Sequence, residues 1–195
     1  MTRLVDIGVP EALLERACAG EEAARCSLYL ALGPATFSLI RRLVGARAVA
    51  EDVFQDTMVI FYERLAQFRR EGPLGAWLRQ IAVSRCLMHL RSPWRRLRLS
   101  LDPADAVGAS DLQRTLPVTP AYREEYLDLE RALATLAPTA RAVLWMYEVE
   151  GYTHQEIALA FGRSVSFSKS QLARAHLRLR AWFEPQGNRP PCTLI

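Results

Sequence analysis

The sequence has few of the residues that build metal sites, disulfide frameworks or membrane spans. Its four cysteines form no C-x-x-C pair and come no closer than eight residues apart, which argues against a zinc knuckle and against a disulfide framework. No window approaches the roughly 18 uninterrupted apolar residues of a membrane helix. The N-terminus carries acids among its apolar positions, unlike a signal peptide. We therefore expect a cytoplasmic protein without metal or cofactor.

The residues of common catalytic motifs are also scarce. There are three histidines, and the chain has no H-E-x-x-H, no carboxylate pair beside a metal-ligand histidine and no glycine-rich phosphate loop. His154 and Glu156 form the H-x-E of a deaminase zinc site, but the P-C-x-x-C that completes such a site is missing. The sequence thus argues against a DNA-modifying enzyme, and we expect no catalytic activity.

Two long stretches lack acidic residues altogether. They lie between Glu71 and Asp102 and between Glu156 and Glu184, whereas the net charge of the whole chain is only +4. Either stretch alone would suit an arginine-rich, solvated helix face. Two of them in one chain favour two contacts with a polyanion, because each neutralised phosphate releases counterions. The basic residues in the two stretches are Arg79, Arg85, Arg91, Arg95, Arg96 and Arg98, and then Arg163, Lys169, Arg174, Arg178 and Arg180.

The hydrophobic pattern predicts an all-α fold. Apolar residues recur at spacings of three and four within 24–44, 48–68 and 74–90, and no alternating apolar run suggests a strand. Gly33-Pro34 is expected to kink or interrupt the first of these helices. Gly72-Pro73 separates the second helix from the third.

The chain is predicted to form two small helical domains joined by a flexible linker. We place the first domain at 1–95 and the second at 123–185. The segment between them, 96–122, is rich in proline and carries mainly acidic charge, which is typical of a linker. The tail, 186–195, is expected to be disordered.

The second domain contains a pattern typical of a helix-turn-helix. Pro138 and Gly151 bound one helix, for which Thr139 is the expected N-cap. Thr153 and Glu156 form a capping box for the next helix, which we place at His154–Phe161. Gly162 then supplies the turn, Ser164 caps a longer helix running to about Phe183, and Ala158 is small where the helices approach. A helical hairpin of another kind would share this pattern, but the basic, acid-free last helix favours DNA binding.

The last helix is expected to present a polar face to DNA. Val165, Leu172 and Ala175 are predicted to point inward, while the place of Phe167, in the core or outside it, stays open. The polar face able to reach base edges and phosphates consists of Ser166, Lys169, Ser170 and Arg174.

Residues 46–92 resemble the second conserved region of bacterial RNA polymerase sigma factors, in the small extracytoplasmic-function (ECF) group. The matching motifs are Ala50-Glu51-Asp52, Gln55-Asp56, Trp77-Leu78 and Ile81-Ala82, followed by the basic stretch Arg85–Arg91. Residues 133–176 resemble the fourth region of the same family. The resemblance implies a non-enzymatic initiation factor that binds the clamp and flap of core RNA polymerase and promoter DNA, with a separate anti-sigma protein as its regulator and no insertion into a membrane.

The resemblance also assigns candidate site residues. Those that would dock on core polymerase are Glu51, Asp52, Gln55 and Asp56. Those that would read the minus-ten element are Phe68, Arg69, Arg70, Trp77, Arg79, Arg85, His89 and Arg91, among which Trp77 is expected to be partly buried. Those that would read the minus-thirty-five element are Arg163, Ser164, Ser166, Lys169, Ser170, Gln171 and Arg174. A mixture of aromatic and basic residues suits the capture of melted single-stranded DNA.

Several positions depart from the family pattern. Ser84 and Met88 stand where the family has polar or acidic residues after "IA". Ser168 takes the place of a core valine beside the bulkier Phe167, which suggests that the apolar anchor has shifted by one residue. Gln171 and His176 replace arginines. The alternative interpretation is a free-standing helix-turn-helix regulator whose N-terminal helices form an effector or dimerisation domain.

Overall fold

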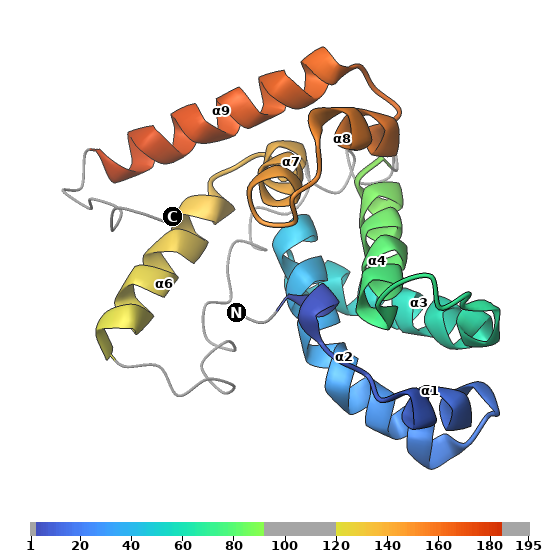
Figure 1. The fold of residues 1–195 in the computed structure, drawn as a ribbon. Helices are drawn as coiled ribbons and strands as arrows, with labels where there is room; N and C mark the ends of the chain where they lie inside the picture. Colours follow the sequence, from blue (N-terminus) through green and yellow to red (C-terminus); the bar gives the residue numbers. More distant parts are fainter. Residues whose placement is uncertain (1–2, 92–119, 185–195) are drawn as a thin grey trace. The chain divides into compact units, whose positions relative to one another are not determined.

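The computed structural model describes residues 3–91 and 120–184 of the 195-residue chain, and within these ranges every regular element is a helix. The predicted all-α fold class is confirmed. The chain divides into two compact units, Met1–Arg95 and Arg96–Ile195 (Figure 1). The predicted tail, 186–195, lies outside the described residues, as does the predicted linker, 96–122, up to Pro120, where a helix begins.

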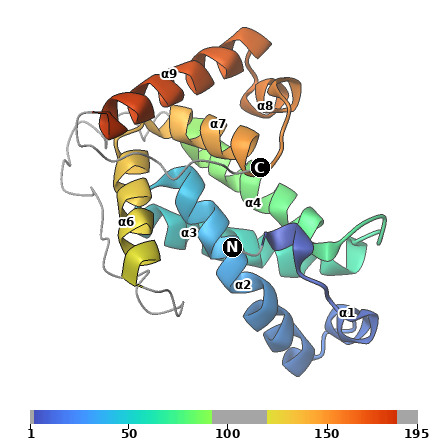
Figure 2. The same ribbon diagram turned by 60° about the vertical axis from the view of Figure 1, so that its left-hand side comes forward.

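The first unit is built around one long helix. Its elements are η1 (Leu4–Asp6), α1 (Glu11–Cys18), α2 (Glu22–Val44), α3 (Arg47–Arg64), η2 (Leu65–Gln67) and α4 (Leu74–Arg91). Helix α2 packs against α1, α3 and α4, as the two views in Figures 1 and 2 show. The largest fully buried side chains of this unit are Leu28, Leu32, Ile40, Leu43, Phe61, Leu65, Leu78 and Leu87. Three helices of predicted apolar periodicity therefore bury their stripes in a common core.

Helix α2 runs through Gly33 and Pro34 without a break, so the predicted interruption does not occur. By length and composition alone α2 is a candidate membrane span, with 39% of its most apolar window buried inside the unit. Leu28, Leu32 and Ile40 on this helix are fully buried. Packing at the centre of a helical core accounts for the apolar character of α2.

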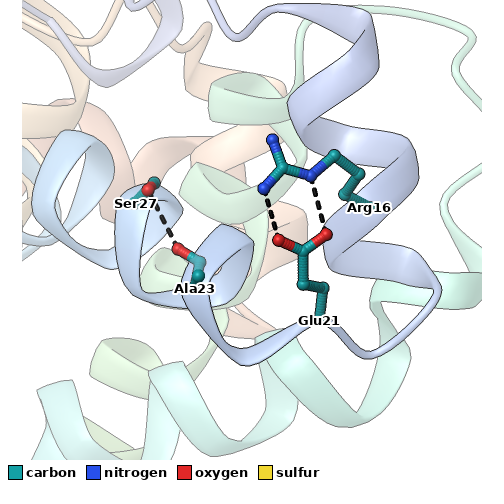
Figure 3. A network of polar contacts seen from close by, with 4 residues as sticks. All are labelled: Arg16, Glu21, Ala23 and Ser27. Carbon is teal, nitrogen blue, oxygen red and sulfur yellow. Dashed lines mark hydrogen bonds and ion pairs between the residues drawn. The ribbon is translucent and has the colours of Figure 1, made fainter.

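The corner between α1 and α2 is closed by an ion pair (Figure 3). Glu21 is the N-cap residue of α2, and its carboxylate accepts a hydrogen bond of 2.7 Å from Nε of Arg16 in α1, with a second bond from the same guanidinium. The hydrogen bond from Arg16 lowers the pKa of the Glu21 carboxyl, and the positive charge of Arg16 acts in the same direction. One turn into α2, the Ser27 hydroxyl donates to the Ala23 carbonyl at 2.9 Å.

The second unit consists of α6 (Pro120–Ala134), α7 (Pro138–Glu148), α8 (His154–Phe161) and α9 (Val165–Phe183). Helix α7 packs against α8 and α9 around the fully buried Val143, Met146 and Ile157. The predicted N-cap of α7 was wrong. Pro138 occupies the first turn, where its missing N–H costs nothing, so the cap position falls on Ala137 and Thr139 lies inside the helix.

Candidate nucleic-acid interface

Helices α8 and α9 form the predicted helix-turn-helix. The capping box is present, because the Thr153 hydroxyl accepts from the Glu156 N–H and the Glu156 carboxylate accepts from the Thr153 N–H. Gly162 ends α8 in the left-handed region, at φ 61°, and the Arg163 N–H donates back to the Ala158 carbonyl at 2.9 Å. The Ser164 hydroxyl then accepts from the Phe167 N–H and starts α9. Local signals in the sequence thus set both helix ends and the turn.

The candidate reading residues lie mainly on the outside of α9. Leu172 and Ala175 are buried, as predicted, but Val165 is 38% exposed, so its predicted inward orientation was wrong. It is the first residue of α9, next to the turn, and the following residues make the contact with α8. Among the residues proposed to reach DNA, Gln171 is half-buried, and those that are exposed are Arg163, Ser164, Ser166, Lys169, Ser170 and Arg174.

The open question about Phe167 is answered by its contact with α8. Its ring centroid lies 5.6 Å from that of Phe161, and the side chain is half-buried. Ser168, the next residue, is completely buried. Position 168 therefore still points into the core, while Phe167 supplies the apolar contact with α8 that a serine cannot make.

A polar contact between α8 and α9 was not foreseen from the sequence. His154 Nδ1 lies 3.0 Å from the Ser168 Oγ, and the imidazole stacks on the ring of Tyr147 in α7 with 4.4 Å between centroids. The two hydrogen-bonded residues are 14 positions apart, so only the folded arrangement brings them together. The hint in the sequence was a serine at a core position.

Helix α3 carries the candidate docking face. Glu51, Asp52, Gln55 and Asp56 are all exposed. On the opposite side of the helix, Val53 and Met58 are buried, and Phe54 packs edge-on against Phe37 with 5.6 Å between centroids. The helix is therefore anchored by its apolar side and presents acids to solvent, as docking on a basic surface requires.

Two of the docking acids have basic neighbours within the same unit. Glu51 pairs with Arg47 at 2.8 Å, one helical turn away, and Asp56 pairs with Arg85 of α4 at 2.7 Å. Among the described residues, no ion pair reaches Asp52. Asp52 thus offers its negative charge to a partner with the least internal competition.

The candidate minus-ten residues separate into two groups. In the first, aromatic rings form a continuous cluster with tilted planes: the Trp77 ring centroid lies 5.3 Å from that of Phe68, at 33°, and 5.7 Å from that of Phe61, at 48°. Phe68 and Trp77 are each half-buried, as expected for Trp77. A partly exposed aromatic pair of this kind can still offer a ring edge or face to an unstacked base.

The second group is basic, and its members differ in their surroundings. Arg69 and Arg91 are exposed, whereas Arg79, Arg85 and His89 are half-buried. Arg70 adopts a positive φ of 58° and pairs with Glu11 and with Glu15 of α1, the latter at 3.5 Å. Arg70 and Arg85 therefore already hold carboxylates before any DNA phosphate arrives.

A pocket of about 330 Å³ lies beside the loop that carries Phe68 and Arg70. Its other wall comes from residues 5–9, which include the end of η1. The start of α4 approaches this segment so closely that a Cβ atom on Gly75 would lie 2.0 Å from the Leu4 carbonyl oxygen. The N-terminal segment is thus packed onto the start of α4, a contact that the sequence pattern does not predict.

Comparison with known proteins identifies both units. Residues 28–96 match the family model described as Sigma-70 region 2, and residues 126–179 match that described as Sigma-70, region 4. The chain belongs to the sigma-70 family. Together the two matches cover the acidic face of α3, the aromatic cluster of Phe61, Phe68 and Trp77, and the helix-turn-helix as far as residue 179. Sigma factors are transcription initiation factors, so the alternative of a free-standing regulator is not favoured.

Relatives place this sigma factor in the extracytoplasmic-function group. It is 26% identical to the RNA polymerase sigma factor NccH of Alcaligenes xylosoxydans xylosoxydans over 181 residues, which cover 91% of this chain and 96% of the relative. It is 30% identical to the ECF RNA polymerase sigma factor SigM of Mycobacterium tuberculosis over 132 residues. These residues cover 67% of this chain and 62% of the relative.

A solved structure shares the fold. The sigma factor RpoE from Bartonella quintana, crystallised in complex with the anti-sigma factor NepR, superposes with a TM-score of 0.55 at 20% identity. The match covers 82% of this chain and 96% of that one. The family-model matches confirm the predicted family, and this likeness agrees with the predicted fold.

Proposed function

We propose that this sigma factor binds core RNA polymerase through the acidic face of α3 and directs it to promoters whose two elements are read by the two units. The observation that carries the proposal is the presence, in family order within one chain, of an anchored acidic helix and of a helix-turn-helix with an acid-free outer helix. An isolated DNA-binding domain has no need of the former.

Polymerase docking rests on Glu51, Asp52, Gln55 and Asp56. These four polar side chains lie together on one exposed face of α3. Exposed acids accelerate association with a basic surface. Asp52 contributes most, because Glu51 and Asp56 share their charge with arginines of the same unit.

Reading of the minus-thirty-five element rests on α9. Its N-terminal half carries Ser166, Lys169 and Ser170 on the exposed side, and Arg174 follows one turn later. In a helix-turn-helix this half of the second helix enters the major groove. Hydroxyl groups there can contact any base, while Lys169 and Arg174 supply phosphate or guanine contacts.

Reading of the minus-ten element rests on the first unit. The partly exposed ring pair of Phe68 and Trp77 offers a platform for melted bases, and the acid-free α4 offers positive charge for the strand. Arg69 and Arg91 are exposed for this purpose. Arg70 and Arg85 contribute when DNA phosphates compete with Glu11, Glu15 and Asp56 for them.

The proposed factor works in the cytoplasm and catalyses no reaction itself. Its partners are core polymerase at the clamp and flap, promoter DNA and a separate anti-sigma protein. The RpoE of Bartonella quintana, which shares the fold, was crystallised with such an inhibitor.

A gel-shift experiment tests this function. Promoter DNA selected from a randomised pool is mixed with the chain alone, with core polymerase alone and with both. We expect a stable, sequence-specific complex only with both. Tight specific binding by the chain alone would instead favour an independent regulator.

A further inference from the structure

Ser168 presents an unusual arrangement for a buried hydroxyl. In the other unit the buried Thr36 and Thr57 donate to the carbonyl four residues earlier in their own helix, at 2.8 and 2.7 Å. The hydroxyl of Ser168, equally buried, instead meets the imidazole of a different helix at 3.0 Å. Its hydrogen bond therefore ties two helices together.

The imidazole of His154 is held from both sides. Its ring lies almost parallel to that of Tyr147, at 18° with 4.4 Å between centroids, while Nδ1 faces Ser168. One half-buried side chain thus connects α7, α8 and α9. Stacking fixes the plane of the ring, and the plane fixes the direction in which Nδ1 points.

A hydrogen bond is directional, unlike the apolar contact that a valine at position 168 would make. Ser168 is followed directly by Lys169 and Ser170, two of the proposed reading residues. A rotation of α9 that broke the hydrogen bond to His154 would also move the side chains of Lys169 and Ser170 relative to the major groove of the DNA. Without His154 the buried hydroxyl would turn to a carbonyl of its own helix, as those of Thr36 and Thr57 do, and it would no longer join α9 to α8.

We propose that His154 is a positioning residue for promoter reading: by bonding Ser168 through Nδ1 it fixes the rotation of α9. This role rests on the proposed function of α9. His154 itself touches no DNA in the proposal.

Replacement of His154 by asparagine and by glutamine distinguishes a role in positioning α9 from a role in stability alone. In asparagine the amide oxygen and nitrogen are bonded to Cγ, as Nδ1 is in histidine, whereas in glutamine they are bonded to Cδ and reach about as far as Nε2. His154→Asn therefore keeps an atom that can bond Ser168, and His154→Gln keeps size and polarity but moves the amide away. Both variants are made in the full chain and assembled with core polymerase.

The measurement is the affinity of each holoenzyme for a promoter selected by the wild-type holoenzyme. It is repeated on the same DNA with a scrambled minus-thirty-five element. We expect His154→Gln to weaken binding to the intact promoter about tenfold and His154→Asn to stay within about twofold, as a buried hydrogen bond predicts. On the scrambled DNA the difference should vanish.

Ser168→Ala provides a second, independent route to the same answer. It should weaken binding about as much as His154→Gln, and the double variant should be no weaker than either single one, because both remove one hydrogen bond. Thermal unfolding of every variant checks that the second unit is folded at the assay temperature.

Equal affinities of the His154→Asn and His154→Gln holoenzymes, or additive effects of His154→Gln and Ser168→Ala, would overturn the role of His154. Failure of the wild-type chain to select any promoter with core polymerase would instead contradict the proposed function on which this role rests. The two failures are therefore told apart by the wild-type result.

Discussion

Arg85 of α4 lies 2.7 Å from Asp56 of α3, and this pair joins two residues that the family resemblance assigns to different tasks. Arg85 was predicted to meet promoter DNA and Asp56 to meet polymerase. Arg85 is 27% exposed and Asp56 is 60% exposed, so both remain within reach of a partner. In the proposed function, docking and DNA capture therefore share one ion pair on the surface of the first unit.

Replacement of Arg85 by alanine should have only a small effect on stability. A pair with one largely exposed member contributes up to about 1 kcal/mol. We expect Arg85→Ala to lower the free energy of unfolding by no more than this, as measured by chemical denaturation. Arg69→Ala, on the exposed loop, is the matched control and should leave stability unchanged. A loss of several kcal/mol for Arg85→Ala would mean that the pair holds the two helices together.

Asp52→Arg should impair binding to core polymerase. The substitution reverses the charge at the docking acid that has no ion pair among the described residues, and like charges across an interface cost several kcal/mol. We expect at least a tenfold loss of affinity in a binding titration with core enzyme. Glu63→Arg, three turns further along the same helix, should be close to wild type. If both variants bind equally well, the docking face lies elsewhere.

Lys169→Ala and Arg174→Ala should weaken promoter binding by the holoenzyme without affecting its assembly. Each removes one exposed positive charge from α9. For a phosphate contact the slope of log affinity against log salt should fall by about 1 per substitution. Arg131→Ala, on α6, serves as the control and should leave that slope unchanged. Unchanged slopes for Lys169→Ala and Arg174→Ala would place the DNA on another surface.

Gly75→Ala should loosen the N-terminal segment. The added methyl group would lie 2.0 Å from the Leu4 carbonyl oxygen, so η1 has to move. Overpacking of this kind costs about 1–3 kcal/mol. Hydrogen exchange at residues 4–7 should become faster. At Gly72 a Cβ atom meets nothing within 4 Å, so Gly72→Ala should leave exchange at η1 as in the wild type. Equal exchange in the two variants would show that the segment is not packed as described.

Stability should fall in alkaline solution. Burial raises the pKa of the Cys86 thiol from 9.0 to about 12 and that of the Tyr62 hydroxyl from 10.0 to about 12. The folded state therefore keeps these protons where the unfolded state loses them. Their contribution is complete below pH 9 and is lost progressively as the pH rises to about 12.

Denaturation at a series of pH values checks this expectation. Tyr62→Phe should flatten the decline between pH 10 and about 12, whereas Tyr29→Phe, at an exposed position, should not. A decline identical in all three proteins would exclude Tyr62 as a source of the pH dependence.

The sequence predicted the helix-turn-helix well because its signals are local. The Thr153 capping box, the left-handed Gly162 and the Ser164 cap each act within three or four residues, and all three are present. The prediction that Thr139 caps α7 was wrong although this signal is equally local, because Pro138 takes the first turn of the helix. The predicted inward orientation of Val165 was wrong because helical periodicity does not fix at which residue after a turn the buried stripe begins.

Contacts between distant residues could not be read from the sequence. Arg70 meets Glu11 across 59 positions, and His154 meets Ser168 across 14. Periodicity placed each of these residues on a helix or a loop without saying which helix would lie opposite. The sequence therefore predicted the candidate DNA-binding residues but not which of them are held by carboxylates of the same unit.

Reconstituted transcription measures directly whether this chain directs polymerase to a promoter. Core RNA polymerase, the chain and a template carrying the selected promoter are combined, and the run-off product is measured. We expect a discrete transcript that requires the chain and is lost when either promoter element is scrambled. Absence of such a transcript from a holoenzyme that has assembled on the promoter would contradict the assignment of this chain as a promoter-reading sigma factor.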